Sequence, residues 1–296
     1  MRYGIMAMQL DALIPTELAP EEFPAYVTDF SHATLVRGLC DQGFRLIELG
    51  GDLVGFMPQT FAPSQIEALA DLKMERGLDY TVHLPLWSVE PSSPLEPIRE
   101  GSARTAIDVI QATLPLEPEV YVLHATGALA AEFMRMALPA TGKRMLLRRF
   151  EQAAIRSLSE ILNETAIPTR QLSIETIEFP LDLTLEMAEL LDLSLCFDVG
   201  HVVSGFSGPL DVWSALDACA PRIAEVHLHD AVESASQDEI IYGQDHTPLG
   251  TGDLDVGRFL DELVAMDFDG PIIFELRVEE AKASLDYIRE VRPETL

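Results

Sequence analysis

The chain has 296 residues, of which 48% are apolar and 23% are charged, so it can bury a full hydrophobic core and is neither disordered nor fibrous. Its net charge of −29 repels phosphate backbones, and its basic residues gather only between Lys143 and Arg149, which argues against broad binding to nucleic acid. Three widely spaced cysteines exclude a disulfide scaffold and favour the reducing cytoplasm. Because the sequence has neither a leader-like start nor an apolar run of about 18 residues, we expect no export and no membrane span.

Short β-rich segments alternate along the chain with longer segments of helical periodicity, a pattern typical of parallel βα units. The predicted strands span residues 2–8, 44–49, 80–84, 120–125, 172–176, 193–198, 223–229 and 271–275. The predicted helices span residues 31–42, 64–76, 97–113, 143–165, 181–191, 210–219, 255–266 and 278–291. Ser31, Ser64 and Asp255 are predicted N-caps, and Gly43 and Gly77 are predicted to follow helix ends. The pattern predicts an α/β fold, a single (β/α)8 TIM barrel, and without a compositional break we expect one domain over residues 1–296.

Three connections that follow predicted strands are long: residues 85–96, 126–142 and 230–254. In a (β/α)8 barrel such loops cover the C-terminal mouth, where active sites are built. The second loop carries Phe133, Met134 and Met136 and has two readings: an apolar lid over a bulky ligand, or a short additional helix packed on the barrel rim.

Polar side chains stand at the C-terminal ends of strands that are otherwise apolar. They are His83, His124, Glu175, Asp198, His227, His229 and Glu275. Barrel closure brings these strand ends to one mouth, so residues distant in the sequence are expected to meet there. A lone histidine at such a position is more often an ordinary core or rim residue than a ligand, but seven polar residues together favour a shared site.

Imidazole nitrogen and carboxylate oxygen are the ordinary ligands of zinc, manganese and iron in proteins. His201, three residues after Asp198, and His246, in the last long loop, are two further candidates. The predicted metal ligands are His83, His124, Glu175, Asp198, His201, His227, His246 and Glu275. Because this set exceeds what one ion can use, we expect two or three transition-metal ions per chain, with zinc favoured over manganese or iron.

Two of the remaining polar residues, Glu48 and His229, have more than one possible role. Glu48 could be a ligand, a substrate contact or a carboxylate held by the backbone amides of Gly50 and Gly51. His229 could contact substrate or orient a ligand. His32, in the first predicted helix, is expected at the surface.

The ordered segments HLP, LHATG, SIET, CFDVGH, EVHLHD, DHTPLGTGDLD and FELR resemble the xylose isomerase-like barrel superfamily, in particular its endonuclease IV branch (AP endonuclease family 2). The resemblance runs from about Gly4 to Ile288 and implies a trinuclear zinc site that hydrolyses a phosphodiester, with its ligands at the eight positions given above. The chain departs from the branch at one point. An Asp is expected two residues before His246, whereas this chain has Gln244 there and Asp245 next to the histidine.

The same superfamily contains sugar isomerases and epimerases, for which the resemblance implies a single manganese or magnesium ion. Its ligands would be Glu175, Asp198, His227 and Glu275. The additional histidines His83, His124 and His246 favour hydrolysis, although the first two also occur in some epimerases. Within the hydrolases, the stretches LEPEVYVLHATG, IETIEF and HLHD are similar to cobamide-remodelling phosphodiesterases, which open the nucleotide loop of a corrinoid.

Taken together, these features predict a metal-dependent phosphodiesterase that acts on a small molecule, with a corrinoid as one candidate. The alternative is a sugar isomerase or epimerase, and a third reading is a non-catalytic corrinoid or metal binder. In the predicted hydrolysis, Glu175 and Glu275 are the catalytic residues, because they would hold the activated water between two ions. The expected partner is a small-molecule substrate, with neither nucleic acid nor a membrane.

Overall fold

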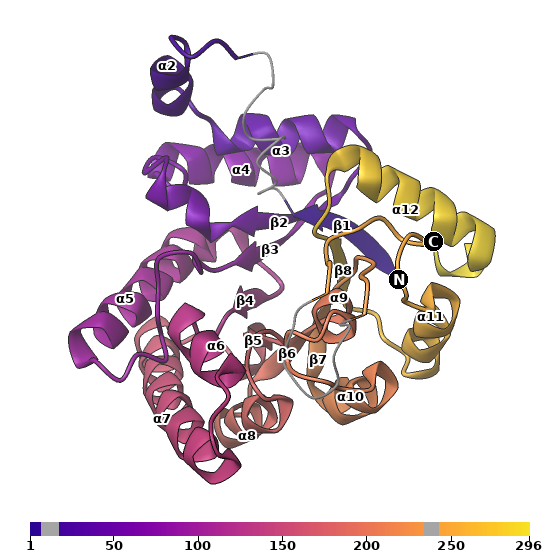
Figure 1. The fold of residues 1–296 in the computed structure, drawn as a ribbon. Helices are drawn as coiled ribbons and strands as arrows, with labels where there is room; N and C mark the ends of the chain where they lie inside the picture. Colours follow the sequence, from indigo (N-terminus) through magenta and orange to yellow (C-terminus); the bar gives the residue numbers. More distant parts are fainter. Residues whose placement is uncertain (7–17, 234–242) are drawn as a thin grey trace.

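In the computed structural model, which describes residues 1–6, 18–233 and 243–296, eight parallel strands close into a barrel (Figure 1). The strands are β1 Arg2–Met6, β2 Leu46–Gly50, β3 Asp79–His83, β4 Tyr121–Leu123, β5 Leu172–Glu175, β6 Ser194–Asp198, β7 Ile223–His227 and β8 Pro271–Phe274. Each strand pairs with the next, and β8 pairs with β1. The predicted (β/α)8 barrel is confirmed, while residues 7 and 8 of the first predicted strand lie outside the described residues.

Helices surround the barrel on its outer side (Figure 1). Those that follow the strands are α3 His32–Asp41, α4 Pro63–Arg76, α5 Glu96–Thr113, α7 Ala140–Thr165, α8 Leu181–Leu191, α10 Val212–Cys219, α11 Val256–Ala265 and α12 Val278–Val291. Further elements are α2 Phe23–Thr28, α6 Ala128–Arg135, α9 Val199–Val203 and the 3-10 turns Gly51–Gly55, Leu114–Leu116, Thr169–Gln171, Ala220–Arg222 and Pro293–Thr295. Within the described ranges, no helix is both long and apolar enough to cross a membrane.

Local sequence signals set several helix ends. The side chains of Ser31 and Asp255 accept hydrogen bonds from backbone amides of the first turns of α3 and α11, as N-caps do. Gly77 ends α4 in the left-handed conformation, with φ of 64°. The predicted cap at Ser64 is wrong: α4 begins one residue earlier because Pro63, with its fixed φ, suits the first helical position.

The main core lies between the barrel and the helices around it. Alternate strand residues pack into it, among them the fully buried rings of Tyr80, Tyr121, Phe197 and Phe274. The intervening residues face the inside of the barrel. Towards the C-terminal strand ends these inner positions become polar, and this is where the site is built.

The loop over residues 126–142 forms a short extra helix, α6, on the barrel rim. The ring of Phe133 lies 5.5 Å from that of Phe150 on α7, and Met134 is buried in the main core. The second reading of this loop is therefore confirmed, and no residue of it is among the described residues that line the cavity at the mouth.

His32 is buried, so the prediction that it lies at the surface is wrong. Its ring lies between those of Phe30 and Phe61, with centroids 6.3 and 5.4 Å away. His32 stands four and seven residues before Val36 and Leu39, on the helix face that packs against the core. Burial lowers the pKa of His32 to about 4, so its ring is neutral at pH 7.

Candidate metal centre

The predicted ligands surround the floor of a cavity of about 550 Å³ at the C-terminal mouth of the barrel. Six of them line it: His83, His124, Glu175, His201, His246 and Glu275. Asp198 and His227 lie just below, both without solvent exposure. The structure thus brings together all eight side chains, as expected from the strand ends, from α9 for His201 and from the loop after β7 for His246.

Three ligand groups share two carboxylates. The first is His83, His124 and Glu175; the second is Glu175, Asp198, His227 and Glu275; the third is His201, His229, His246 and Glu275. Within each group, one nitrogen or oxygen atom per residue lies within 4.8 Å of the others. Glu175 therefore joins the first two groups, and Glu275 joins the last two.

The first group is the tightest. Nε2 of His83 and Nε2 of His124 lie 3.1 and 2.8 Å from the same oxygen, Oε2 of Glu175. In the central group, Nδ1 of His227 lies 3.4 Å from Glu275, 3.7 Å from Asp198 and 3.8 Å from Glu175. Atoms at these separations could share a single ion without a change of backbone.

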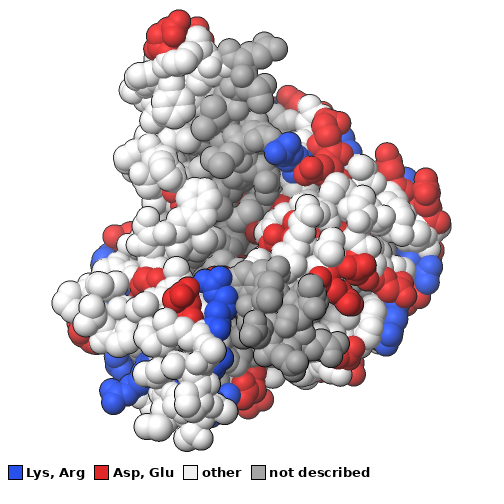
Figure 2. All heavy atoms as spheres, viewed as in Figure 1, with Lys and Arg blue, Asp and Glu red and all other residues white. Residues whose placement is uncertain are grey.

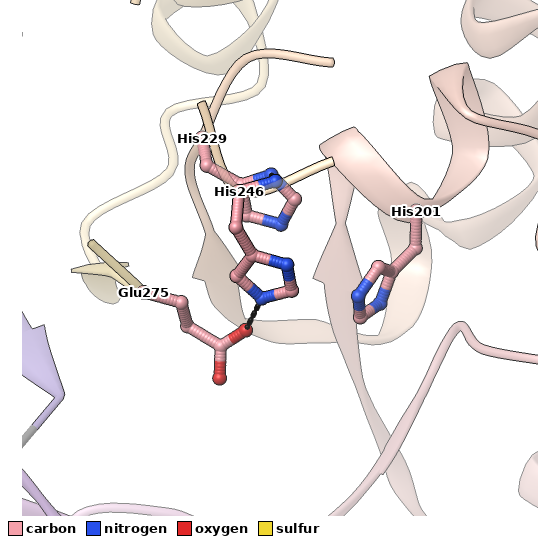
Figure 3. Close-up of side chains that lie close together, drawn as sticks. All are labelled: His201, His229, His246 and Glu275. Atoms are coloured by element: carbon pink, nitrogen blue, oxygen red, sulfur yellow. Dashed lines mark hydrogen bonds and ion pairs between the residues drawn. The ribbon is translucent and has the colours of Figure 1, made fainter. Parts of the chain in front are cut away.

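Asp245 lies against the third group, although the sequence left its role open. Its Oδ2 lies 2.9 Å from Nδ1 of His246 and 3.5 Å from Nε2 of His201. His246 in turn lies 2.9 Å from Oε2 of Glu275 through its Nε2 (Figure 3). The backbone of His246 has φ of 49°, an uncommon left-handed conformation for a histidine, at the point where the loop enters the site.

His229 orients a carboxylate of the site. Its Nε2 lies 3.1 Å from Oδ2 of Asp198, and its Nδ1 lies 3.0 Å from the backbone amide nitrogen of His246 and 3.2 Å from the backbone carbonyl oxygen of Asp230. The rings of His229 and His246 stack with centroids 4.2 Å apart (Figure 3). A Cβ atom at Gly200 would lie 2.1 Å from the His229 ring, so this approach requires glycine.

Glu48 has no hydrogen bond to Gly50 or Gly51, and with Glu225 and His227 it forms a fourth group of atoms that could hold a metal ion, below the central group. Its Oε2 lies 3.4 Å from Nε2 of His227, on the side of that ring opposite the central group, and neither of its oxygens has a hydrogen-bond partner in the described residues. Glu225, which the sequence analysis missed, lies 3.9 Å from the same nitrogen and accepts a hydrogen bond from Thr81. Its position two residues before His227, on the same strand face, was the available signal.

Unpartnered buried atoms test whether ions fit this site. Oε1 of Glu175 and Nδ1 of both His201 and His227 are buried and have no hydrogen-bond partner among the described residues. Yet Nδ1 of His201 lies only 3.1 Å from Oε1 of Glu175. Buried polar atoms that converge without bonding to one another are what two ligands of one cation present, so the residues fit divalent metal ions.

The ionisation of the buried side chains is also what a site for divalent metal ions requires. Burial works against the ionised carboxyl of Glu175, but the nearby histidines His124 and His227 hold its pKa well below its usual range. Burial likewise disfavours a charged His83, but the carboxylates of Glu175 and Glu48 raise its pKa to about 9. The pKa of Glu225 is raised by burial and by the charge of Glu48. The lowered pKa favours an ionised Glu175, whereas the raised pKa favours a neutral Glu225. Ionised carboxylates buried in the site need positive charge nearby, which protons on the histidines or metal ions can supply.

Comparisons with known proteins agree with this fold. A profile of the xylose isomerase-like TIM barrel family matches residues 39–291. The chain therefore belongs to the xylose isomerase-like TIM barrel family. The protein MJ1311 of Methanocaldococcus jannaschii, described as uncharacterized, is 23% identical over 237 residues, which span 77% of this chain and 75% of that protein.

Two solved structures represent the two chemistries considered above. A D-tagatose 3-epimerase-like protein has a TM-score of 0.72 at 18% identity and covers 100% of this chain and 98% of its own. Endonuclease IV from Thermus thermophilus has a TM-score of 0.67 at 18% identity, covering 99% of this chain and 100% of its own. At such identities the similarity establishes the shared fold and does not identify the reaction.

Proposed function

We propose that this protein is a metal-dependent hydrolase that cleaves a small phosphodiester, with the nucleotide loop of a corrinoid as a candidate substrate. The observation that carries the proposal is the sharing of Glu175 and Glu275, which links three ligand groups in a row. Ions held side by side by bridging carboxylates suit in-line displacement at phosphorus, whereas proton transfer at carbon needs only one.

The residues would divide the work as follows. His83, His124 and Glu175 would hold one ion and the central group a second. From the third group His201, His246 and Glu275 would hold a third ion, with Asp245 in place of His229, because Nε2 of His229 faces Asp198. When bound, such ions stabilise charge on phosphoryl oxygens and activate water. Glu275, which lines the cavity, would orient the attacking water. Glu175, buried below it, would keep the histidines of two groups in position.

A sugar isomerase or epimerase is the second candidate. The central group of Glu175, Asp198, His227 and Glu275 could hold a single ion, and the D-tagatose 3-epimerase-like structure shares the fold. The two glutamates would then move protons at carbon. A single ion in the central group would leave His83, His124 and His246 outside its ligands. Since the first two also occur in some epimerases, His246 is the residue for which we favour hydrolysis.

One preparation of the protein tests both candidates. After zinc or manganese loading and dialysis, elemental analysis should give two or three ions per chain, and the protein should hydrolyse bis(p-nitrophenyl) phosphate. Glu275→Gln should lower the rate by about a hundredfold or more, because it removes the charge of a shared ligand. Glu279→Gln, on a side chain that is 85% exposed, is the matched control and should not change it. About one ion per chain, with ketose interconversion and no ester hydrolysis, would favour the epimerase.

A further inference from the structure

Two large aromatic side chains are exposed beside the metal centre. Trp87, in the loop after β3, is 48% exposed and lines the cavity, and Phe56, which follows the 3-10 turn after β2, is 62% exposed. Their ring centroids lie 5.8 Å apart with the planes at 68°, an edge-to-face pair. Apolar rings of this size gain free energy when they leave water, so a ligand that covered them would be stabilised.

The backbone beneath Trp87 is firmly held. The carboxylate of Asp52, which is only 6% exposed, accepts hydrogen bonds from the backbone amides of Leu86 and Trp87 at 2.9 to 3.1 Å. A Cβ atom at Gly51 would lie 2.6 Å from Pro85, so the two loops pack closely. Trp87 is thus presented to the cavity by a fixed loop.

The cavity wall between Trp87 and the metal ligands is mainly apolar. Leu86, Ile177, Phe206 and Met6 contribute to it, and outside the three ligand groups the described wall has charged side chains at Glu178, Asp245 and Arg277. A sugar would need several hydrogen-bonding groups for its hydroxyls on this wall. A flat aromatic ring needs none and gains from stacking on an indole.

We propose that Trp87, supported by Phe56, is the stacking platform for a planar aromatic group that the substrate carries next to its phosphate. This inference rests on the proposed hydrolase function and names its substrate class: phosphodiesters of an aromatic or heteroaromatic compound. The metal centre takes the phosphate, and the rim of the cavity takes the ring.

Phenylphosphonate and methylphosphonate test the platform, because they share a phosphonate that cannot be hydrolysed and differ in the ring. Trp213, on α10, is the other tryptophan of the chain, and the guanidinium of Arg258 lies 3.8 Å from the centre of its ring. Because the chain has two tryptophans, the Trp213→Phe protein has fluorescence from Trp87 alone. In the metal-loaded Trp213→Phe protein, phenylphosphonate should quench the Trp87 fluorescence saturably and methylphosphonate should not. By calorimetry, Trp87→Leu should weaken phenylphosphonate binding about tenfold and leave methylphosphonate unchanged, and Trp87→Phe should retain most of the affinity.

Equal affinity of the two probes for the wild-type protein would overturn the inference. So would a Trp87→Leu protein that, with full metal content, loses both probes alike, because the side chain would then only support the site. Binding of the two probes does not depend on catalysis. A failure of the hydrolase proposal would therefore be seen in a different measurement: metal-loaded wild-type protein would not hydrolyse bis(p-nitrophenyl) phosphate.

Discussion

Asp245 shows what single residues add to the pattern that the sequence reveals. The strand-end residues of the site can be predicted because their place is fixed by the period of the strand and the closure of the barrel. Asp245 lies in a loop, one residue from where the resemblance expects a carboxylate. The left-handed backbone of His246, with φ of 49°, turns the chain there, and the sequence gives no sign of that conformation. The Asp245 carboxylate reaches both histidines even though Gln244 fills the expected position.

If Asp245 is a ligand, Asp245→Asn should lower the metal content by about one ion per chain, because an amide oxygen carries no charge to balance the cation. The matched control is Gln244→Ala, on the exposed neighbouring residue, which should keep the full content. Elemental analysis of both dialysed proteins gives the result. Loss of an ion from Gln244→Ala but not from Asp245→Asn would assign the ligand to the glutamine.

His32 makes a separate prediction about stability. Its pKa is about 4 in the folded protein and about 6.5 when unfolded, so the unfolded state binds more protons as the pH falls. Above pH 6.5 the ring is neutral in both states, and its contribution to the free energy of unfolding is complete. As the pH falls from 6.5 towards 4, the free energy of unfolding decreases by about 3 kcal/mol from this residue. His32→Leu should remove this part of the acid sensitivity. Urea unfolding at several pH values checks it, and parallel pH profiles of the two proteins would contradict it.

At the level of elements, Asp230 organises the loop that follows β7. Its two carboxylate oxygens accept five backbone hydrogen bonds, at 2.8 to 3.1 Å, from the amides of Ala231, Gly250, Thr251, Gly252 and Leu254. Asp230 also forms an isolated antiparallel bridge with Thr247, next to His246. The segment HLHD and the later segment PLGTGDLD are thus parts of one structure. The sequence did not predict this contact, because the periodicity of apolar residues carries no information on contacts between loop segments.

Asp230→Asn should destabilise the fold by about 3 kcal/mol, because an amide has one acceptor oxygen and its NH2 would face backbone donors. The third ligand group should also lose metal, since the same loop carries His246. Asp255→Asn is the control: asparagine caps a helix as well as aspartate does, so α11 should be unaffected. Denaturant unfolding and metal analysis give the two results. An Asp230→Asn protein as stable as the control would show that the bonds are not required.

At the scale of the whole molecule, the fold was predictable because eight strand and helix periods agree with one architecture. The helix α6 is one of the two readings of its loop, whereas α9 and the 3-10 turns are too short to show a period. That residues 1–296 form a single domain stays a prediction. Charge acts at this scale as well. Figure 2 shows acidic side chains in several patches among uncharged ones, largely toward the right edge of the view, and basic side chains in smaller separate groups.

This charge leads to a prediction about DNA, which matters because endonuclease IV shares the fold. Binding to duplex DNA gains free energy mainly where basic side chains neutralise phosphates and release counterions, and a chain of net charge −29 repels the duplex over the range of the screened field. In physiological salt, the metal-loaded protein should neither bind a fluorescent duplex that contains an abasic site nor incise it. Lower salt should not produce binding, because weaker screening strengthens the repulsion as well. Efficient incision would overturn the proposal of a small phosphodiester as substrate, but it would not contradict the proposed metal centre. The two proposals depend on different parts of the molecule, because the surface and rim select the substrate and the strand ends beneath them would hold the ions.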